Sequence, residues 1–256
     1  MEGKSKRKGL LTTVIVVLCI AAVIILNRVF GNRRYYITSI LIMLLSIIPF
    51  LFSFERRKPK PMEFVVLLVL CGIGILSRVI FTAFPAFKPM TAVIIITGMA
   101  FGPQSGFLTG VMTLFLSNYF FGQGPWTPWQ MVAFGFAGFI SGLLAEKGVL
   151  PKNNKNIIAI YGYALVQLVI GPFLDLCSFL TSFGMAPTTT MWDLLKSGFS
   201  YNMVHAVAVA LFLLLLYNPI MDKLERIKIK YGMMEDEAQS FEDIFGEEKK
   251  EEAEEK

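Results

Sequence analysis

Residues 64–84 read FVVLLVLCGIGILSRVIFTAF, and this stretch decides the fold class. Among its 21 residues there is a single charge, Arg78. A helix that crosses the hydrocarbon core of a bilayer needs about 20 predominantly apolar residues. The stretch therefore predicts a transmembrane helix with one basic side chain inside it.

Further apolar stretches predict an all-α polytopic membrane protein with about eight transmembrane helices. The expected spans are Leu10–Leu26, Tyr36–Phe54, Phe64–Phe84, Met90–Gly102, Phe107–Phe121, Gln130–Ala145, Ile157–Leu180 and Gly198–Tyr217. Met90–Gly102 and Phe107–Phe121 are short, and glycines and a proline crowd their junction. They are either a tight helical hairpin or one kinked helix, and the charge pattern favours two helices.

The composition supports a membrane protein and argues against a nucleic-acid binder. Hydrophobic residues make up 55% of the 256 residues and charged residues only 17%, whereas a soluble domain carries about 25% charge. The net charge is +5, but the basic residues form short runs beside apolar stretches, where they orient helices in a bilayer. Cys19, Cys71 and Cys177 lie far apart in apolar stretches, without metal-ligand spacing, and are expected to be core residues.

The positive-inside rule predicts that both termini are cytoplasmic in a multi-pass protein of the plasma membrane. With this orientation, the segments on the cytoplasmic side hold fifteen lysines and arginines outside the acidic tail, and the segments on the outer side hold five. The inner ones are Lys4, Lys6, Arg7, Lys8, Arg56, Arg57, Lys58, Lys60, Lys147, Lys152, Lys155, Lys223, Arg226, Lys228 and Lys230. The outer ones are Arg28, Arg33, Arg34, Lys88 and Lys196.

Three regions are expected along the chain. Residues 1–62 would form a basic segment and two N-terminal helices, and residues 63–220 a six-helix substrate-binding core. Residues 221–256 turn from basic to strongly acidic, which is typical of a disordered cytoplasmic tail.

Polar residues inside the expected spans gather at one depth. At 1.5 Å per residue, Arg78 lies roughly 21 Å and Asp175 roughly 27 Å from the inner ends of their helices. All such residues fall in the outer half of the membrane, and intramembrane polar residues mark functional sites by default. They are Arg78, Asn118, Asp175, Asn202 and His205. The pattern favours a pocket open to the outside, although Arg78 and Asp175 simply pairing with each other is the competing interpretation.

The expected outer loop after residue 119 reads FFGQGPWTPWQ (residues 120–130) and suits a planar organic ligand. Trp126 and Trp129 offer flat apolar faces, and Gln123 and Gln130 offer hydrogen-bonding amides. The tryptophans alone would also fit an interfacial aromatic belt. Lys88, in the outer segment Phe84–Pro89, is a further candidate, although it could equally snorkel.

Catalytic motifs of the common hydrolase and ATPase types are missing from the sequence. There is no G-x-x-x-x-G-K-[ST], no H-E-x-x-H and no G-x-S-x-G. His205 is the only histidine, and it is expected to be a packing residue on an apolar helix. The sequence therefore predicts no enzyme, no metal and no cofactor.

Several motifs resemble the substrate-binding S components of energy-coupling factor (ECF) transporters, closest to the branch tied to cobalamin or to queuosine precursors. They are Ser77-Arg78, Phe87 to Ala92, Gly98 to Pro103 and, most specifically, FGQGPWTPWQ at 121–130. The resemblance covers roughly Phe64 to Tyr217. It implies a six-helix core with a substrate site near the outer face, so the helices before residue 55 are extra.

The resemblance also implies partners and site residues. A transmembrane T protein and two ABC ATPases would complete the importer, with docking through small residues of the first core helix. That helix offers Cys71, Gly72 and Gly74 where the family often has alanines. The expected substrate-binding residues are Arg78, Lys88, Asn118, Gln123, Trp126, Trp129, Gln130, Asp175 and Asn202.

The favoured cargo is cobalamin or another corrinoid, and a queuosine-precursor deazapurine is the first alternative. A membrane-embedded enzyme and a structural assembly subunit are the alternatives from other classes. Aromatic rings beside amides fit many flat heterocycles, so the residues leave the ligand open.

Overall fold

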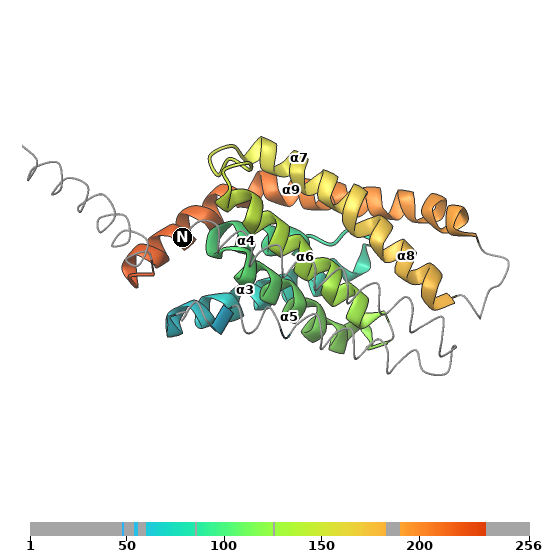
Figure 1. Ribbon diagram of the computed structural model, residues 1–256, viewed down its shortest axis with the longest axis horizontal. Coiled ribbons are helices and arrows are strands. Elements are labelled where there is room, and N and C mark those ends of the chain that lie inside the picture. The colour runs from blue at the N-terminus through green and yellow to red at the C-terminus, as the bar shows by residue number, and fades with distance from the viewer. Residues whose placement is uncertain are drawn as a thin grey trace, which may run out of the picture.

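The computed structural model describes residues 48, 54–55, 60–84, 86–124, 126–182 and 190–233. All regular secondary structure in this part is helical (Figure 1). The expected span Leu10–Leu26, most of Tyr36–Phe54 and the acidic stretch from residue 234 lie outside the described residues.

The elements follow one another in a simple order. They are α3 (Pro61–Ile80), the 3-10 turn η2 (Phe81–Ala83), α4 (Met90–Phe101), α5 (Pro103–Phe121), α6 (Thr127–Glu146), α7 (Lys155–Leu165), the π-helical segment η3 (Val166–Ile170), α8 (Gly171–Ser182) and α9 (Met191–Lys230).

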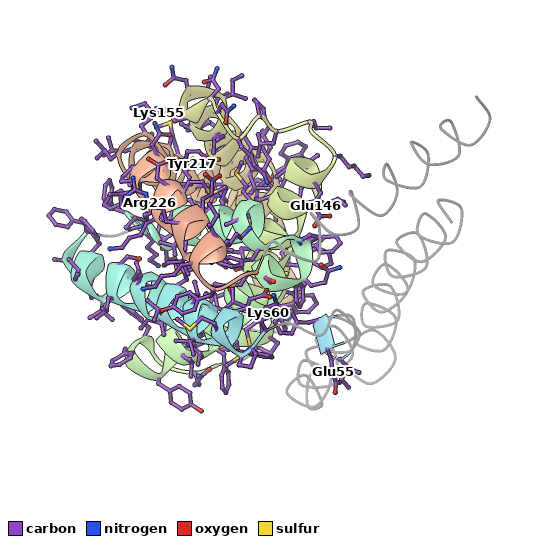
Figure 2. The ribbon with its side chains drawn as sticks, turned by 90° about the vertical axis from the view of Figure 1, so that its left-hand side faces the viewer. Glu55, Lys60, Glu146, Lys155, Tyr217 and Arg226 are labelled. Atoms are coloured by element: carbon purple, nitrogen blue, oxygen red, sulfur yellow. The ribbon has the colours of Figure 1, made fainter. Side chains whose placement is uncertain are left out.

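Four helices in the described part are long and apolar enough to cross a membrane: Pro61–Ala83, Thr127–Glu146, Lys155–Ser178 and Trp192–Lys230. They support a multi-pass membrane protein, and the predicted count of eight spans is not confirmed. The end that carries Lys60, Lys155 and Arg226 is called the basic end (Figure 2). The opposite end, which carries the α5–α6 loop with Trp126, is called the Trp126 end.

Helix α4 is the centre of the bundle, and all twelve of its residues are buried. It packs against α3, α5, α6 and α9 (Figure 1). At about 18 Å it is short for a span, and its neighbours shield it from lipid on every side. Its apolar sequence therefore reflects a buried core helix.

Two separate helices replace the single kinked helix that the sequence left open for residues 90–121. The chain reverses at Gly102, whose φ of 87° lies in the region that favours glycine. Pro103 then begins α5, where its missing N–H costs nothing. The two helices lie against each other, since a Cβ on Gly106 would come within 2.6 Å of the Gly98 Cα.

The expected span Ile157–Leu180 is one rod with a π-helical segment in its middle. The Gly171 N–H donates to the carbonyl of Val166, five residues back, in place of the usual four. Pro172 explains this local change, because it has no N–H and its ring crowds the carbonyl four residues before it.

Helix α9 is longer than the expected span Gly198–Tyr217, with 40 residues and a length of about 60 Å. It begins with a capping box, in which the Thr190 hydroxyl accepts from the Asp193 N–H and Asp193 accepts from the Thr190 N–H. At the basic end, Tyr217 donates to the Lys152 carbonyl at 3.0 Å, and Lys228 donates to the Ala100 carbonyl. Residues 221–230, which the sequence assigned to the tail, are thus part of a packed helix.

Candidate functional site

Arg78 is the centre of a buried polar network at the Trp126 end. It lies in the last turn of α3 and is only 6% exposed. Its Nη1 donates to the Ser117 hydroxyl at 2.6 Å and to Asn118 Oδ1 at 2.7 Å, both on α5. The guanidinium also lies 4.4 Å from the centre of the Phe121 ring. A cation is thereby held by two neutral acceptors and an aromatic face.

Asn118 extends this network into the loop before α6. Its Nδ2 donates to the Thr127 hydroxyl at 3.2 Å and to Gln130 Oε1 at 3.0 Å. The Gly124 N–H donates to the same Thr127 hydroxyl at 3.1 Å. The structure therefore brings together Arg78, Asn118 and Gln130, three of the residues expected at the site.

Asp175 and Asn202 form a second polar pair, between α8 and α9. The Asn202 Nδ2 donates to Asp175 Oδ2 at 2.9 Å. A Cβ on Gly198 would lie 2.4 Å from that same oxygen, so α9 approaches the carboxylate closely because it has a glycine there. Among the described residues, no ion pair joins Asp175 to Arg78, so the competing interpretation, in which these two charges pair with each other, is not seen.

His205 lies in α9 one turn toward the basic end from Asn202, and it is only 5% exposed. The Thr91 hydroxyl is 3.0 Å from its Nε2, and the Phe134 ring is 6.0 Å away, centre to centre. This histidine thus packs among α4, α6 and α9, beneath the Asp175–Asn202 pair.

The remaining loop residues differ in how they are presented. Trp126 is 51% exposed, whereas Trp129 is 3% exposed and packs against Phe173. Gln123 donates to the Phe115 carbonyl at 3.0 Å, and Lys88 donates to the Tyr201 hydroxyl at 2.9 Å. Only Trp126 of the two tryptophans therefore presents a ring that an incoming ligand could cover.

This geometry is accompanied by a match to one protein family. Residues 65–222 match the family described as the ECF-type riboflavin transporter, S component. The match spans more than half of the chain. It covers every helix from α3 to α9 apart from the first residues of α3 and the last residues of α9. The chain belongs to this family. No significant match to a curated protein or to a solved structure was found.

The S component is the substrate-binding subunit of an ECF importer and not an enzyme. Membership therefore implies a small-molecule substrate and association with the ECF T protein and its ATPase module. It also agrees with a multi-pass protein of the plasma membrane, as the apolar helices indicate.

The docking residues expected on this S component divide between two faces of α3. The Cys71 thiol donates to the Thr109 carbonyl at 3.7 Å, so it faces α5. Gly74 also faces α5, because a Cβ there would lie 2.9 Å from the Thr113 methyl. Gly72 has open space around it. Of the three, only Gly72 is placed where another subunit could approach.

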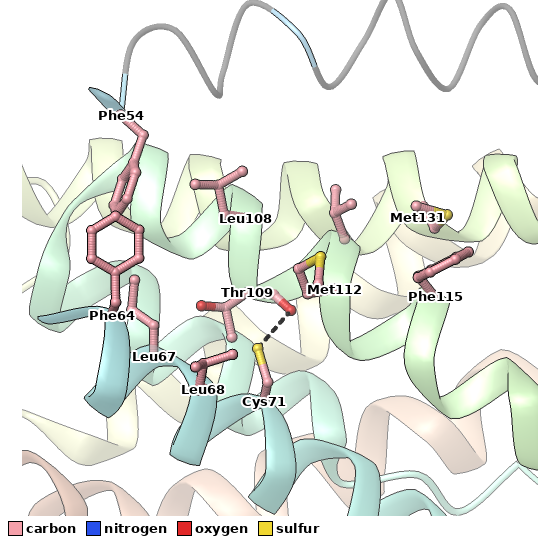
Figure 3. A pocket seen from close by; sticks show the side chains of 11 residues that line it. Phe54, Phe64, Leu67, Leu68, Cys71, Leu108, Thr109, Met112, Phe115 and Met131 are labelled. Atoms are coloured by element: carbon pink, nitrogen blue, oxygen red, sulfur yellow. Dashed lines mark hydrogen bonds between the residues drawn. The ribbon is translucent and has the colours of Figure 1, made fainter. Parts of the chain in front are cut away.

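An apolar groove runs between α3 and α5 of the S component, with Phe54 and Phe64 at one end (Figure 3). Its lining includes Leu68, Met112 and Phe115, and it contains none of the polar network residues. Hydrocarbon walls of this kind suit lipid chains better than a polar-edged solute. The groove is therefore not our candidate for the substrate site.

Sequence reasoning missed several residues of the polar region. Ser117 and Thr127 are network members that look like ordinary helix hydroxyls in the sequence. Thr91 lies within the motif Phe87 to Ala92 and was not a site candidate by itself. Gln167 lies in the long apolar span Ile157–Leu180 and was not a candidate either. A search for every hydrogen-bonding side chain in the outer half of the spans, amides and hydroxyls included, would have found Ser117 and Thr91.

Proposed function

We propose that this S component captures a planar, polar-edged micronutrient at its Trp126 end, and that riboflavin is the first candidate. The observation that carries the proposal is the state of Arg78. A buried cation in a membrane is costly and is retained where function requires it. Its hydrogen-bond partners in the described part are neutral, and its buried Nε has none. A guanidinium with a spare donor favours a ligand that carries carbonyl or anionic oxygens.

Riboflavin fits these groups chemically. One edge of its ring system carries two carbonyls and an N–H, while the faces of the rings are flat and apolar. Arg78 supplies donors for the carbonyls, and the amides of Asn118 and Gln130 supply both donors and acceptors. Trp126 supplies an exposed aromatic face. The family's name points to the same ligand.

Cobalamin is the second candidate, and the loop at 121–130 favours it through its resemblance to the cobalamin and queuosine-precursor branch. A corrinoid is much larger than riboflavin, and its entry would require the loop around Trp126 to move away from the network. A deazapurine precursor of queuosine is the third candidate, and its small ring would use the same amide groups without that movement.

We further propose that the basic end faces the cytoplasm and that the Trp126 end faces outward. The positive-inside rule supports this orientation, because Lys60, Lys155 and Arg226 lie at the basic end (Figure 2). In this orientation substrate enters from outside, and the T protein docks on the face of α3 that carries Gly72.

The experiment is a riboflavin titration of the purified full-length chain, followed by quenching of flavin fluorescence, with native mass spectrometry for the ligand panel. We expect Arg78→Gln to weaken riboflavin binding about 30-fold, the value of a lost charge-assisted hydrogen bond. Lys147→Gln, a charge change at the basic end, serves as the matched control and should bind normally.

The possible results separate the candidates. Cyanocobalamin or a deazapurine retained in place of riboflavin keeps the importer function and changes the cargo. Equal affinity in Arg78→Gln and the wild type would show that the Arg78 network is not the site.

A further inference from the structure

Gln167 is a buried amide whose oxygen has no hydrogen-bond partner among the described residues. The side chain is 9% exposed, and Oε1 is enclosed without a donor. The large majority of buried side-chain polar atoms in proteins are paired, so each exception requires a physical explanation. In a membrane bundle the cost of such a group is high, because lipid offers no donors in place of water.

The backbone around Gln167 is also unusual. Gln167 is the second residue of the π-helical segment η3, which Pro172 helps to create. Val166, Gln167 and Ile170 face the interior, whereas Leu168 and Val169 face outward. Single π-helical turns inside α-helices are frequent at functional sites. The wide turn therefore holds the Gln167 amide inside the bundle, where the neighbouring residues of the rod are apolar.

The packing of α9 fixes the depth of Gln167. Gly171 lies against Asn202, since a Cβ on that glycine would be 2.5 Å from the Asn202 amide. Gly162 lies beside Val209, since a Cβ on Gly162 would be 3.2 Å from a methyl group of Val209. The rod and α9 run antiparallel (Figure 1), and the two glycine contacts put Gln167 at about the level of His205. It thus lies about one turn below Asn202 and about two turns below Asp175.

We propose that Gln167 forms the floor of the ligand site and that its Oε1 accepts a hydrogen bond from an N–H group of the bound ligand. The inference rests on the function proposed above and names a recognition group for it. An acceptor without a donor in the empty protein is satisfied when a ligand brings the donor. The ligand class is a heterocycle with an imide or amide N–H, which the flavin ring and the corrinoid side amides both contain.

The test compares three probes on the full-length chain in lipid nanodiscs: riboflavin, 3-methylriboflavin and cyanocobalamin. The methyl group removes the imide N–H of the flavin. Gln167→Met keeps the length of the side chain and removes the acceptor. We expect it to weaken riboflavin binding about tenfold and to leave the already weaker binding of 3-methylriboflavin unchanged. Gln167→Glu keeps an oxygen in place and should retain more affinity than Gln167→Met.

Thr113→Val is the matched control. Its hydroxyl is also buried with no hydrogen bond of normal geometry in the described part of the chain, but it lies at the α3–α5 contact beside Gly74. Removing it should leave every probe affinity unchanged. Melting of the empty protein supplies a readout independent of ligand, and Gln167→Met should melt no lower than the wild type, because an unsatisfied acceptor has been removed.

Other outcomes would overturn the role. Equal riboflavin affinity in Gln167→Met and wild type shows that the amide does not contact ligand. A melting temperature several degrees lower in the empty variant shows that the amide holds a structural water or another internal donor. If only cyanocobalamin binds the wild type, the same tenfold loss must appear with that probe. A wild type that binds neither vitamin overturns the proposed function and this role together.

Discussion

At the scale of single residues, the polar side chains within the helices divide into those that are satisfied internally and those that are not. Asp175 accepts from Asn202, and His205 is bonded to Thr91. Among the described residues, Arg78 Nε and Gln167 Oε1 have no hydrogen-bond partner. One atom is a donor and the other an acceptor, which matches the carbonyl and N–H groups of the ligand proposed above.

Asn118→Asp should separate stability from binding. Asn118 Oδ1 accepts from Arg78, and its Nδ2 donates to Thr127 and Gln130. A carboxylate there would pair with the guanidinium, while the Thr127 hydroxyl and the Gln130 amide could turn to donate to it. We expect unchanged or higher thermal stability and at least about tenfold weaker riboflavin binding.

Melting curves and fluorescence titrations of the same preparation measure both quantities. Asn154→Asp, at the N-cap of α7 on the basic end, is the control and should bind riboflavin normally. Stronger binding in Asn118→Asp would contradict the idea that Arg78 is the donor that the ligand needs.

At the scale of elements, close helix contacts through glycine set the geometry of the core. Helices α4, α5 and α6 meet where Gly98, Gly106 and Gly138 face one another, so their backbones almost touch. This contact holds α5 and α6 in fixed positions, and Asn118 and Gln130 of the polar network lie on those two helices. The positions of the network residues thus depend on small side chains well away from them.

Gly138→Ala should be strongly destabilising, whereas Gly72→Ala should not. A Cβ on Gly138 would lie 2.2 Å from the Gly106 carbonyl oxygen and 2.4 Å from its carbon, so backbone must move. We expect a loss of about 2–3 kcal/mol, typical of core overpacking. A Cβ on Gly72 meets nothing within 4 Å, and alanine is the better helix former by about 1 kcal/mol.

Thermal unfolding of the two variants in identical detergent checks this difference. Similar melting temperatures for both variants would mean that α5 and α6 separate more easily than the contact indicates.

At the scale of the whole molecule, the helices form a bundle with two unlike ends, and the family match shows that such a bundle works with other subunits. The Trp126 end holds the buried network under the α5–α6 loop. The basic end carries lysines and arginines from several segments, and α9 extends to it along the full bundle (Figures 1 and 2). The proposed substrate site and the basic segments thereby lie at opposite ends of the bundle.

Cysteine labelling tests the orientation of these ends. In a Cys19→Ser background, Trp126→Cys should react with a membrane-impermeant maleimide on intact cells. Ile229→Cys, at an exposed position near the end of α9, should react only after permeabilisation. Cys71 and Cys177 are buried and should contribute little signal. The reverse pattern would invert the proposed topology.

Gly72→Leu tests the docking face of α3. The bulky side chain should leave riboflavin affinity and melting unchanged, because Gly72 faces away from the bundle. It should reduce co-purification with the ECF T protein and ATPases severalfold, since close helix approach requires small residues. Val207→Leu, on the exposed face of α9, is the control. Unchanged co-purification of Gly72→Leu would place docking elsewhere.

The sequence by itself determined the all-helical class of the described part, because a backbone in lipid must satisfy its hydrogen bonds within each apolar segment. It also indicated that Arg78, Asn118 and Asp175 lie near one end, since depth follows from position along a helix. The turn at Gly102 could be anticipated from the glycines and proline around it. The full length of α9 could not, because its charged last turns are stabilised by contacts such as that of Lys228 with the Ala100 carbonyl.

Only the tertiary structure decided which polar groups meet. Arg78 finds Asn118 forty residues later and not Asp175, and Asp175 finds Asn202 twenty-seven residues later. Gln167 is unsatisfied because no described donor reaches it, which no sequence pattern states. Helix formation depends on local hydrogen bonds and is written along the chain, whereas a side-chain partner depends on how separate helices pack, and that packing is set by all of them together.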